Sequence, residues 1–242
     1  MSIEWLTPDW PVPPSVRALS TWRGGGVSGG AFASLNLGDH VGDDPGAVAR
    51  NRRALQDAAR LPAEPVWLRQ VHGTRVVDLG AGVPDAPADA AIARRRGQVA
   101  AILTADCLPV LIATEDGEAV AAAHAGWRGL AAGVLEATVR ALGVPPRRLI
   151  AWIGPGIGRK HYEVGPEVRA AFEGPGAEPA FRPNARGRYF ADLPALARAR
   201  LEALGIEQVG VTADCTYSDA NRYFSHRRDG HCGRQATLIW LD

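Results

Sequence analysis

Residues 99–124 read VAAILTADCLPVLIATEDGEAVAAAH, and this stretch decides the fold. Three apolar runs of strand length, at 99–105, 108–113 and 119–124, follow one another with only short polar breaks between them. Strands joined by such tight turns favour an α+β fold with mixed sheets, and argue against a doubly wound fold in which strands and helices strictly alternate.

Caps and stop signals indicate where helices lie around these strands. Asp44 precedes Pro45 as an N-cap, and Gly143 ends an apolar stripe that begins at Leu130. The expected helices cover residues 44–61, 130–142, 166–172 and 194–205. The expected strands cover residues 16–22, 66–71, 75–79, 99–105, 108–113, 119–124, 149–153, 208–213, 222–225 and 236–241. Two stretches rich in proline and glycine, 80–87 and 174–183, are expected to be surface loops.

The composition is that of a globular protein with nearly balanced charge. Of the 242 residues 46% are hydrophobic and the formal net charge is +1, so a large basic surface for nucleic acid is not expected. The N-terminal sequence MSIEWLTPDWPVPP resembles no signal or transit peptide, and the longest apolar stretch, 99–113, is too short to cross a bilayer. Three cysteines without an export signal indicate free thiols. Cys215 and Cys232 are expected either to pack in the interior or to support the site from behind its first ligands. We therefore expect a cytoplasmic protein with one domain over residues 1–242.

Three residues that bind soft metals or act as nucleophiles stand at the ends of apolar runs. His72 follows the run 65–71, whereas Cys107 and His124 come at the ends of two of the strands quoted above. Strand ends carry side chains to the rim of a sheet, where functional sites gather. Two imidazoles and one thiolate make the three-ligand kind of catalytic zinc site that leaves a fourth position open. The sequence spacing alone does not show that the three residues meet.

Motifs along nearly the whole chain resemble those of the laccase-domain family. They are TWRGGGVSGGAFASLNLGDHVGDD at 21–44, QVHG at 70–73, TADCLPVL at 104–111, HAGWRGL at 124–130, IGPGIG at 153–158 followed by HYEVG, and CTYSDANRYFSHRRDGHCGRQATLIWL at 215–241. That family was first labelled multicopper polyphenol oxidase; it is now described largely as purine nucleoside phosphorylase and includes the peptidoglycan editing factor. The resemblance implies a single-domain, four-layer α/β/β/α sandwich with mixed sheets, in which His72, Cys107 and His124 match the family's zinc ligands. Gly156 stands where many members carry a cysteine, so that cysteine is not essential here.

The resemblance also implies a zinc enzyme that cleaves purine nucleosides with phosphate. The implied substrates are adenosine, inosine, guanosine and methylthioadenosine, with adenosine deamination as a companion activity. Arg23 and Asn36, in the glycine-rich N-terminal segment, are the candidate substrate-binding residues. Arg128, Arg227 and Arg228 are further candidates, because arginine suits bidentate phosphate recognition. The expected partners are small molecules, not nucleic acid or membranes, and the expected state is a monomer or small homo-oligomer.

Two other chemistries fit the same residues. Cys107 as the nucleophile, with His124 or His72 as its base, makes a metal-free hydrolase that the editing-factor branch would use on a peptidoglycan precursor. Copper at the site would give at most weak polyphenol oxidase activity, because six histidines and one methionine are too few for the copper centres of a true laccase. Asp106, beside Cys107, is either a proton relay or a strand-end cap.

Overall fold

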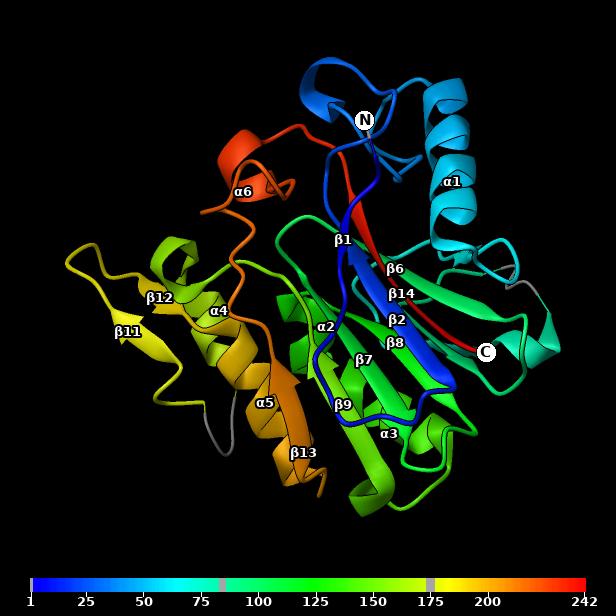
Figure 1. Cartoon of the computed structure of the whole chain (residues 1–242). Coiled ribbons are helices and arrows are strands. Elements are labelled where there is room, and N and C mark those ends of the chain that lie inside the picture. Colours follow the sequence, from blue (N-terminus) through cyan, green and yellow to red (C-terminus); the bar gives the residue numbers. More distant parts are fainter. Residues whose placement is uncertain (1, 83–85, 173–176) are drawn as a thin grey trace.

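Two β-sheets pack face to face in the computed structural model, which describes residues 2–82, 86–172 and 177–242 (Figure 1). The five-stranded sheet has the order β1 (Trp5–Leu6), β2 (Val16–Thr21), β14 (Gln235–Leu241), β6 (Val99–Thr104) and β3 (Val66–Trp67). The six-stranded sheet has the order β13 (Gln208–Val211), β9 (Leu149–Ile153), β7 (Leu108–Thr114), β8 (Val120–Ala125), β5 (Ala90–Ala93) and β4 (Val76–Asp78). A small third sheet, β10 (Glu163–Val164), β12 (Tyr189–Ala191) and β11 (Phe181–Pro183), projects to one side.

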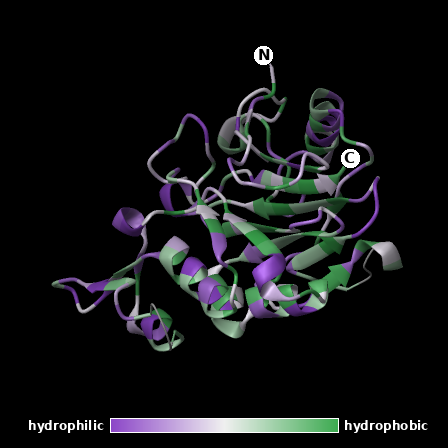
Figure 2. Ribbon diagram, turned by 60° about the horizontal axis from the view of Figure 1, so that its bottom comes forward, coloured by the Kyte–Doolittle hydropathy of each residue, from purple (hydrophilic) through white to green (hydrophobic). Residues whose placement is uncertain are grey.

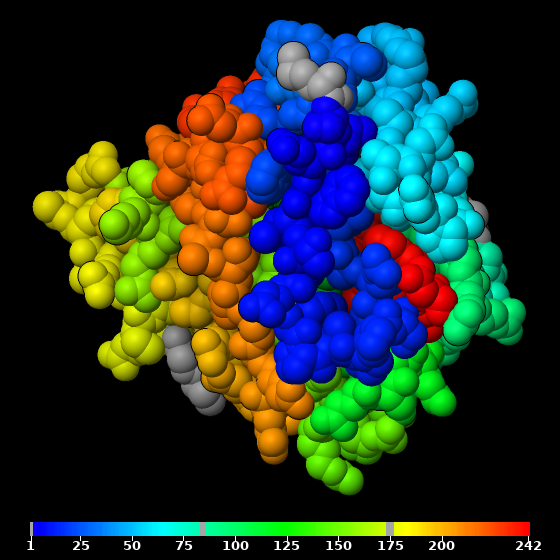
Figure 3. Space-filling model, in the orientation of Figure 1, coloured from blue at the N-terminus to red at the C-terminus, as the bar shows by residue number. Residues whose placement is uncertain are grey.

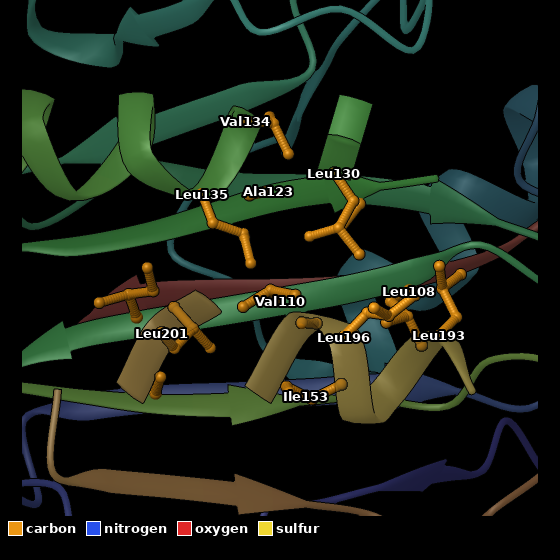
Figure 4. Packing of buried hydrophobic residues seen from close by; sticks show 14 of the residues in the cluster. Leu108, Val110, Ala123, Leu130, Val134, Leu135, Ile153, Leu193, Leu196 and Leu201 are labelled. Atoms are coloured by element: carbon orange, nitrogen blue, oxygen red, sulfur yellow. The ribbon is translucent and has the colours of Figure 1, made fainter. Parts of the chain in front are cut away.

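Helices cover the outer faces of both large sheets. The α-helices of the described residues are α1 (Pro45–Ala59), α2 (Trp127–Ala132), α3 (Val134–Leu142), α4 (Pro166–Ala170), α5 (Leu193–Ala203) and α6 (His226–Asp229). Leu55 of α1 packs on the five-stranded sheet, while the leucines of α2, α3 and α5 pack on Leu108, Val110 and Ile153 of the six-stranded sheet (Figure 4). The layer order is therefore helix, sheet, sheet, helix.

The space between the two sheets is apolar because inward-facing residues alternate along each strand. Ala100 and Ile102 of β6 lie on this inner face, and Val120 and Ala122 of β8 face them from the other sheet. Figure 2 shows the same pattern, with hydrophobic strands in the middle and hydrophilic residues concentrated in the outer loops and on exposed helix faces. The same alternation places His124, two residues beyond Ala122, on the inner face at the end of β8.

The predicted α+β class, the mixed sheets and the α/β/β/α layering are confirmed. The strands β3 and β6 pair parallel, as do β4 with β5 and β9 with β13, whereas the other pairs within the two large sheets are antiparallel. The helix predicted at 44–61 is also confirmed, because the Asp44 carboxylate accepts hydrogen bonds from the N–H groups of Gly46 and Ala47. The extent of the domain over residues 1–242 stays a prediction.

Three predicted elements are wrong in ways that have physical causes. The helix expected at 130–142 is two helices, because Gly133 adopts a left-handed conformation with φ 98° between α2 and α3. The strand expected at 66–71 stops at Trp67, and the Gln70 side chain instead hydrogen-bonds both the N–H and the C=O of Leu103. The segment 222–225 is no strand, since the Gln235 amide bonds its backbone at Phe224.

Other differences concern short elements. The strand β5 was not predicted, because the alanine-rich sequence AAIA has weak β-propensity. The small sheet of β10, β12 and β11 was not predicted either, and β11 occupies part of the loop expected at 174–183. Residues 174–176 of that loop, and residues 83–85 of the loop expected at 80–87, lie outside the described residues.

The N-terminal segment runs across one face of the molecule rather than forming a separate unit. Figure 3 shows it in dark blue, between the orange segment that contains β13 and the red β14. Leu6, Trp10 and Val12 pack against the apolar cluster between the two sheets. Among the described residues, no helix is both long and apolar enough to traverse a bilayer.

Candidate metal centre

His72, Cys107 and His124 meet at one end of the space between the two sheets. One potential ligand atom from each residue lies within 4.8 Å of the other two. The Cys107 sulfur is 3.7 Å from His72 Nε2, and the two imidazole ring centroids are 4.6 Å apart. The prediction from three separate sequence positions therefore describes one cluster.

The three side chains reach the cluster from three different kinds of local structure. His124 belongs to β8 itself, whereas Cys107 lies in the turn between β6 and β7, after Asp106 with φ 91°. His72 has φ 62° in the connection between β3 and β4, five residues beyond the end of the strand that was expected to reach it. The strand-end argument thus holds for two of the three residues, and a loop delivers the third.

Asp89 organises the cluster, and the sequence analysis missed it. Its fully buried carboxylate accepts hydrogen bonds from the backbone N–H groups of Val71 (3.1 Å), His72 (2.8 Å) and Gly73 (2.7 Å). It also lies 2.8 Å from His124 Nδ1. A carboxylate on one ring nitrogen turns the other nitrogen, Nε2, toward Cys107 and His72, as in the carboxylate–histidine–metal arrangements of known sites. The one signal in the sequence was an acid inside the apolar run ADAAIA.

The spacing of one pair of donor atoms is that of a tetrahedral site. Zinc–sulfur bonds of about 2.3 Å and zinc–nitrogen bonds of about 2.05 Å at tetrahedral angles separate sulfur from nitrogen by about 3.6 Å. The observed 3.7 Å between Cys107 and His72 agrees with that spacing. Gly126 keeps the space open, because a Cβ there would stand 2.9 Å from the Cys107 sulfur and 2.5 Å from His72 Cδ2. This chemistry explains why the motif HAGWRG has a glycine after His124 and Ala125.

Charges in the cluster reinforce one another. Burial raises the pKa of Cys107, but hydrogen bonds from His124 and His72 outweigh it and bring the thiol pKa to about 6. Burial lowers the pKa of His124, but its bonds to Asp89 and Cys107 outweigh that effect and raise the pKa to about 9. Burial also raises the pKa of Asp89, but the hydrogen bonds from His124, Gly73 and Val71 outweigh this effect and hold the pKa below its usual value. The polypeptide alone therefore favours the thiolate, the form that binds metal.

A cavity of about 460 Å³ opens over the cluster. Its lining residues are His40, Gln70, His72, Leu103, Thr104, Ala105, Asp106, Cys107, His124, Trp127, Arg128, Ile157, Tyr162, His226, Arg227 and Arg234. In the part of the chain that the structure describes, Arg128, Arg227 and Arg234 form no ion pair with a carboxylate. The cavity therefore combines a metal-type donor set with guanidinium groups whose charge no described carboxylate neutralises, which suits an anion.

The two candidate substrate-binding residues do not line this cavity. Arg23 donates to the carbonyls of Ala33 and Ala220, and its guanidinium lies 4.5 Å from the centroid of the Phe224 ring. Asn36 is fully buried, and its amide bonds Gly38, Asp43 and the N–H of Arg234. In this structure both residues hold loops together, and Asn36 fixes the backbone of a residue that does line the cavity.

Of the further arginine candidates, Arg128 and Arg227 line the cavity and Arg228 does not. The Arg228 guanidinium donates hydrogen bonds to the carbonyls of Thr216, Tyr217 and Tyr223 and forms an ion pair with Asp229. Arg234 and Tyr162 line the cavity without having been singled out from the sequence.

Asp106 and the other cysteines have structural contacts. The Asp106 carboxylate accepts hydrogen bonds from the Thr216 hydroxyl (2.7 Å) and the Arg227 N–H (2.6 Å), so both of its oxygens anchor the C-terminal segment. Cys215 accepts a hydrogen bond from the Gly158 N–H, and Cys232 is buried against Phe224. Cys232 is therefore packed inside, whereas Cys215 is half-buried.

The fold and the site together define a class, an α/β/β/α protein with a His/Cys/His centre in an arginine-lined cavity. The model of the family described as multi-copper polyphenol oxidoreductase laccase matches residues 17–242. The chain belongs to that family, as its motifs indicated.

Named relatives span almost the whole chain. A Pseudomonas aeruginosa protein named purine nucleoside phosphorylase PA4543 is 53% identical over 240 residues, which is 98% of each chain. The Escherichia coli protein named purine nucleoside phosphorylase YfiH is 48% identical over 239 residues, again 98% of each. The crystal structure of Neisseria meningitidis protein NMB0706 superposes with a TM-score of 0.93 at 48% identity, covering 98% of this chain and 99% of that one.

Proposed function

We propose that this protein is a zinc-dependent purine nucleoside phosphorylase that accepts adenosine, inosine, guanosine and methylthioadenosine and also deaminates adenosine. The observation that carries the proposal is the shared cavity, in which a His/Cys/His donor set lies beside guanidinium groups that pair with no carboxylate of the described residues. The names of the P. aeruginosa and E. coli relatives support the same reaction. In this proposal the enzyme acts on small molecules in the cytoplasm, as a monomer or small homo-oligomer.

We propose zinc as the ion and His72, Cys107 and His124 as both its ligands and the catalytic residues. Zinc suits a tetrahedral nitrogen and sulfur set, whereas a blue-copper centre usually adds an axial methionine, and the chain has one methionine in all. Zinc held by these three residues would supply a Lewis acid. Copper(II) is the second ion to test, with weak polyphenol oxidase activity as its signature.

The protein's own groups then have separate tasks. Asp89 fixes the ring of His124, and the small Gly126 leaves room between His72 and Cys107. Trp127 and Ile157 give the cavity an apolar wall for a purine, and the arginines provide contacts for a phosphate anion. Holding both substrates in one cavity lowers the entropic cost of bringing a phosphate oxygen to the ribose carbon. Arg23 and Asn36 would support this site indirectly, through the loops that they anchor.

Product analysis tests the proposal. Zinc-loaded protein is incubated with adenosine, with and without phosphate, and the products are separated by chromatography. Without phosphate we expect inosine alone. With phosphate we expect adenine and ribose 1-phosphate as well, and hypoxanthine from the phosphorolysis of inosine. Cys107→Ser and His124→Ala should lose both zinc and phosphorolysis, whereas the control Cys215→Ser should keep both. Zinc-replete protein that releases no adenine in the presence of phosphate would contradict the proposal.

A second function is favoured by one observation, the row of Cys107, His124 and Asp89. A thiol beside an imidazole that a carboxylate orients is the arrangement of a cysteine hydrolase. Such an enzyme would cleave a peptidoglycan precursor that carries a wrong amino acid. Covalent trapping of Cys107 by an electrophilic substrate analogue, together with turnover by metal-free protein, would favour this function over the first.

A further inference from the structure

One side of the cavity presents a hydroxyl group that the protein itself does not use. Tyr162 follows the 3-10 helix Arg159–His161, and its side chain is buried to all but 8% while lining the cavity. Among the described residues its phenol oxygen forms no hydrogen bond, and it is not one of the fully enclosed polar atoms, so the hydroxyl opens onto the cavity. A group of this kind at a cavity wall is available to a ligand.

Arg227 is held against the ring of the same tyrosine. Its Cζ lies 5.1 Å from the Tyr162 ring centroid, its Nη1 donates to the carbonyl of Glu163 at 2.7 Å, and its backbone N–H donates to Asp106. These contacts fix the guanidinium without neutralising it, because within the described ranges no carboxylate pairs with it. Its remaining N–H groups are therefore preorganised for an external anion.

Arg128 supplies a second cation close to this tyrosine. It is exposed at the start of α2, with its guanidinium 4.5 Å from the centroid of the Trp127 ring. The charges of Arg227 and Arg128 both act on the Tyr162 phenol. Burial and the negative charges of Cys107 and Asp106 nevertheless raise the phenol pKa, so the hydroxyl stays protonated and can donate. Arg234 is less available, since its Nη1 already donates to the carbonyls of Cys232 and Gly233.

We propose that the Tyr162 hydroxyl, the fixed Arg227 guanidinium and Arg128 form the phosphate subsite of the enzyme. This inference rests on the proposed function and assigns Tyr162 as a catalytic residue that touches the co-substrate. Two cations and one neutral donor match a hydrogen phosphate, which offers several acceptor oxygens and carries about two negative charges.

The reaction at this subsite balances without another reactant. A phosphate oxygen forms a bond to the ribose C1′ while the C1′–N9 bond breaks, and the electron pair of that bond leaves with the purine. The proton of the hydrogen phosphate ends on the purine, and the products are ribose 1-phosphate and the free base. Tyr162 donates one hydrogen bond to the phosphate throughout and is unchanged at the end.

The test removes the single hydroxyl. Zinc-loaded wild type and Tyr162→Phe are compared by the KM for phosphate at saturating nucleoside, by the KM for nucleoside, and by titration calorimetry with inorganic phosphate alone. We expect the phosphate KM and dissociation constant to rise about tenfold, as for the loss of one hydrogen bond to a charged group. Zinc content should not change.

Matched controls and a second variant separate the subsite from general damage. Tyr189→Phe removes a tyrosine hydroxyl from the small side sheet, and Arg182→Gln removes an exposed charge there; neither should change phosphate binding. Arg227→Lys keeps the charge but loses the planar fork, so it should weaken phosphate binding less than Arg227→Gln does.

The outcomes distinguish the two proposals. A wild type that phosphorolyses nucleosides while Tyr162→Phe keeps its phosphate KM overturns the subsite and leaves the function standing. A wild type that binds phosphate, loses that affinity in Tyr162→Phe, yet releases no base supports the subsite and overturns the function. Wild-type protein that gives no calorimetric signal with phosphate at millimolar concentrations overturns the subsite.

Discussion

Replacing Asp89 by asparagine changes one atom at the point where the cluster is held together. In the wild type, Oδ1 accepts from the His72 N–H and lies 2.8 Å from His124 Nδ1, while Oδ2 accepts from the Val71 and Gly73 N–H groups. An asparagine has one acceptor oxygen, so its NH₂ group must face one of these two pairs of donors. If the amide nitrogen of Asp89→Asn faces Val71 and Gly73, their two N–H groups lose their acceptor. If it faces His72 and His124, the His72 N–H loses its acceptor and the His124 ring must change tautomer.

The magnitude follows from the one or two donors that lose their acceptor. Each unsatisfied buried group costs about 1–3 kcal/mol, so the free energy of unfolding of the metal-free protein should fall by about 1–6 kcal/mol. If the amide nitrogen faces His124, the ring must carry its proton on Nε2, and that nitrogen no longer binds metal. Loss of such a supporting carboxylate typically lowers metal affinity by about 10–100-fold.

Two assays measure these effects separately. Urea denaturation in the presence of a chelator gives the stability, and competition with a chromophoric chelator gives the zinc affinity. Asp214→Asn is the matched control, because that carboxylate accepts from Arg222 and Tyr223 away from the cavity. We expect Asp214→Asn to bind zinc like the wild type. Zinc binding by Asp89→Asn that is equally tight would contradict the role of this carboxylate.

Three further predictions concern the centre and the core. Gly126→Ala places a methyl group against His72 and Cys107, so zinc measured by elemental analysis after dialysis should fall well below that of the wild type; full retention of zinc would contradict the packing. In zinc-free protein, alkylation of Cys107 by iodoacetamide should rise with pH around a midpoint near 6, because the lowered pKa keeps the thiol ionised above that pH and protonates it only below. Mass spectrometry measures the alkylated fraction at each pH, and a midpoint near 9 would refute the lowered pKa. Leu111→Ala, at a fully buried position of β7, should cost about 2–5 kcal/mol of unfolding free energy in urea titrations, and a cost below about 1 kcal/mol would show that the core is looser than described.

Local patterns predicted the elements whose hydrogen bonds and burial depend on neighbouring sequence. The strands at 99–105, 108–113 and 149–153 are apolar runs bounded by turns, and β6, β7 and β9 lie there within one residue at either end. The helix after Asp44 was recognisable because its cap is two and three residues from the groups that it bonds. The residues that determine such elements lie within or next to them in the sequence.

The wrong or missing predictions concern features that depend on contacts with residues far away in the sequence. The expected strand at 66–71 ends early because Gln70 reaches Leu103, 33 positions away. The role of Asp89 depends on His124, 35 positions away, and periodicity gives no sign of that contact. Arg23 was a reasonable phosphate candidate by residue type, but the fold places Ala33 and Ala220 around its guanidinium. Residue type suggests a chemistry, and only the tertiary structure decides which groups are left free to perform it.

Two of the three donors lie where the chain passes from one sheet to the other. His72 belongs to the connection from β3 to β4 and Cys107 to the turn from β6 to β7, while His124 is part of a strand. The donor set is complete only after the sheets have docked, so we expect a folding chain to capture its ion late. Once bound, the ion would stabilise the docked sheets, because separating them would break its bonds to the ligands.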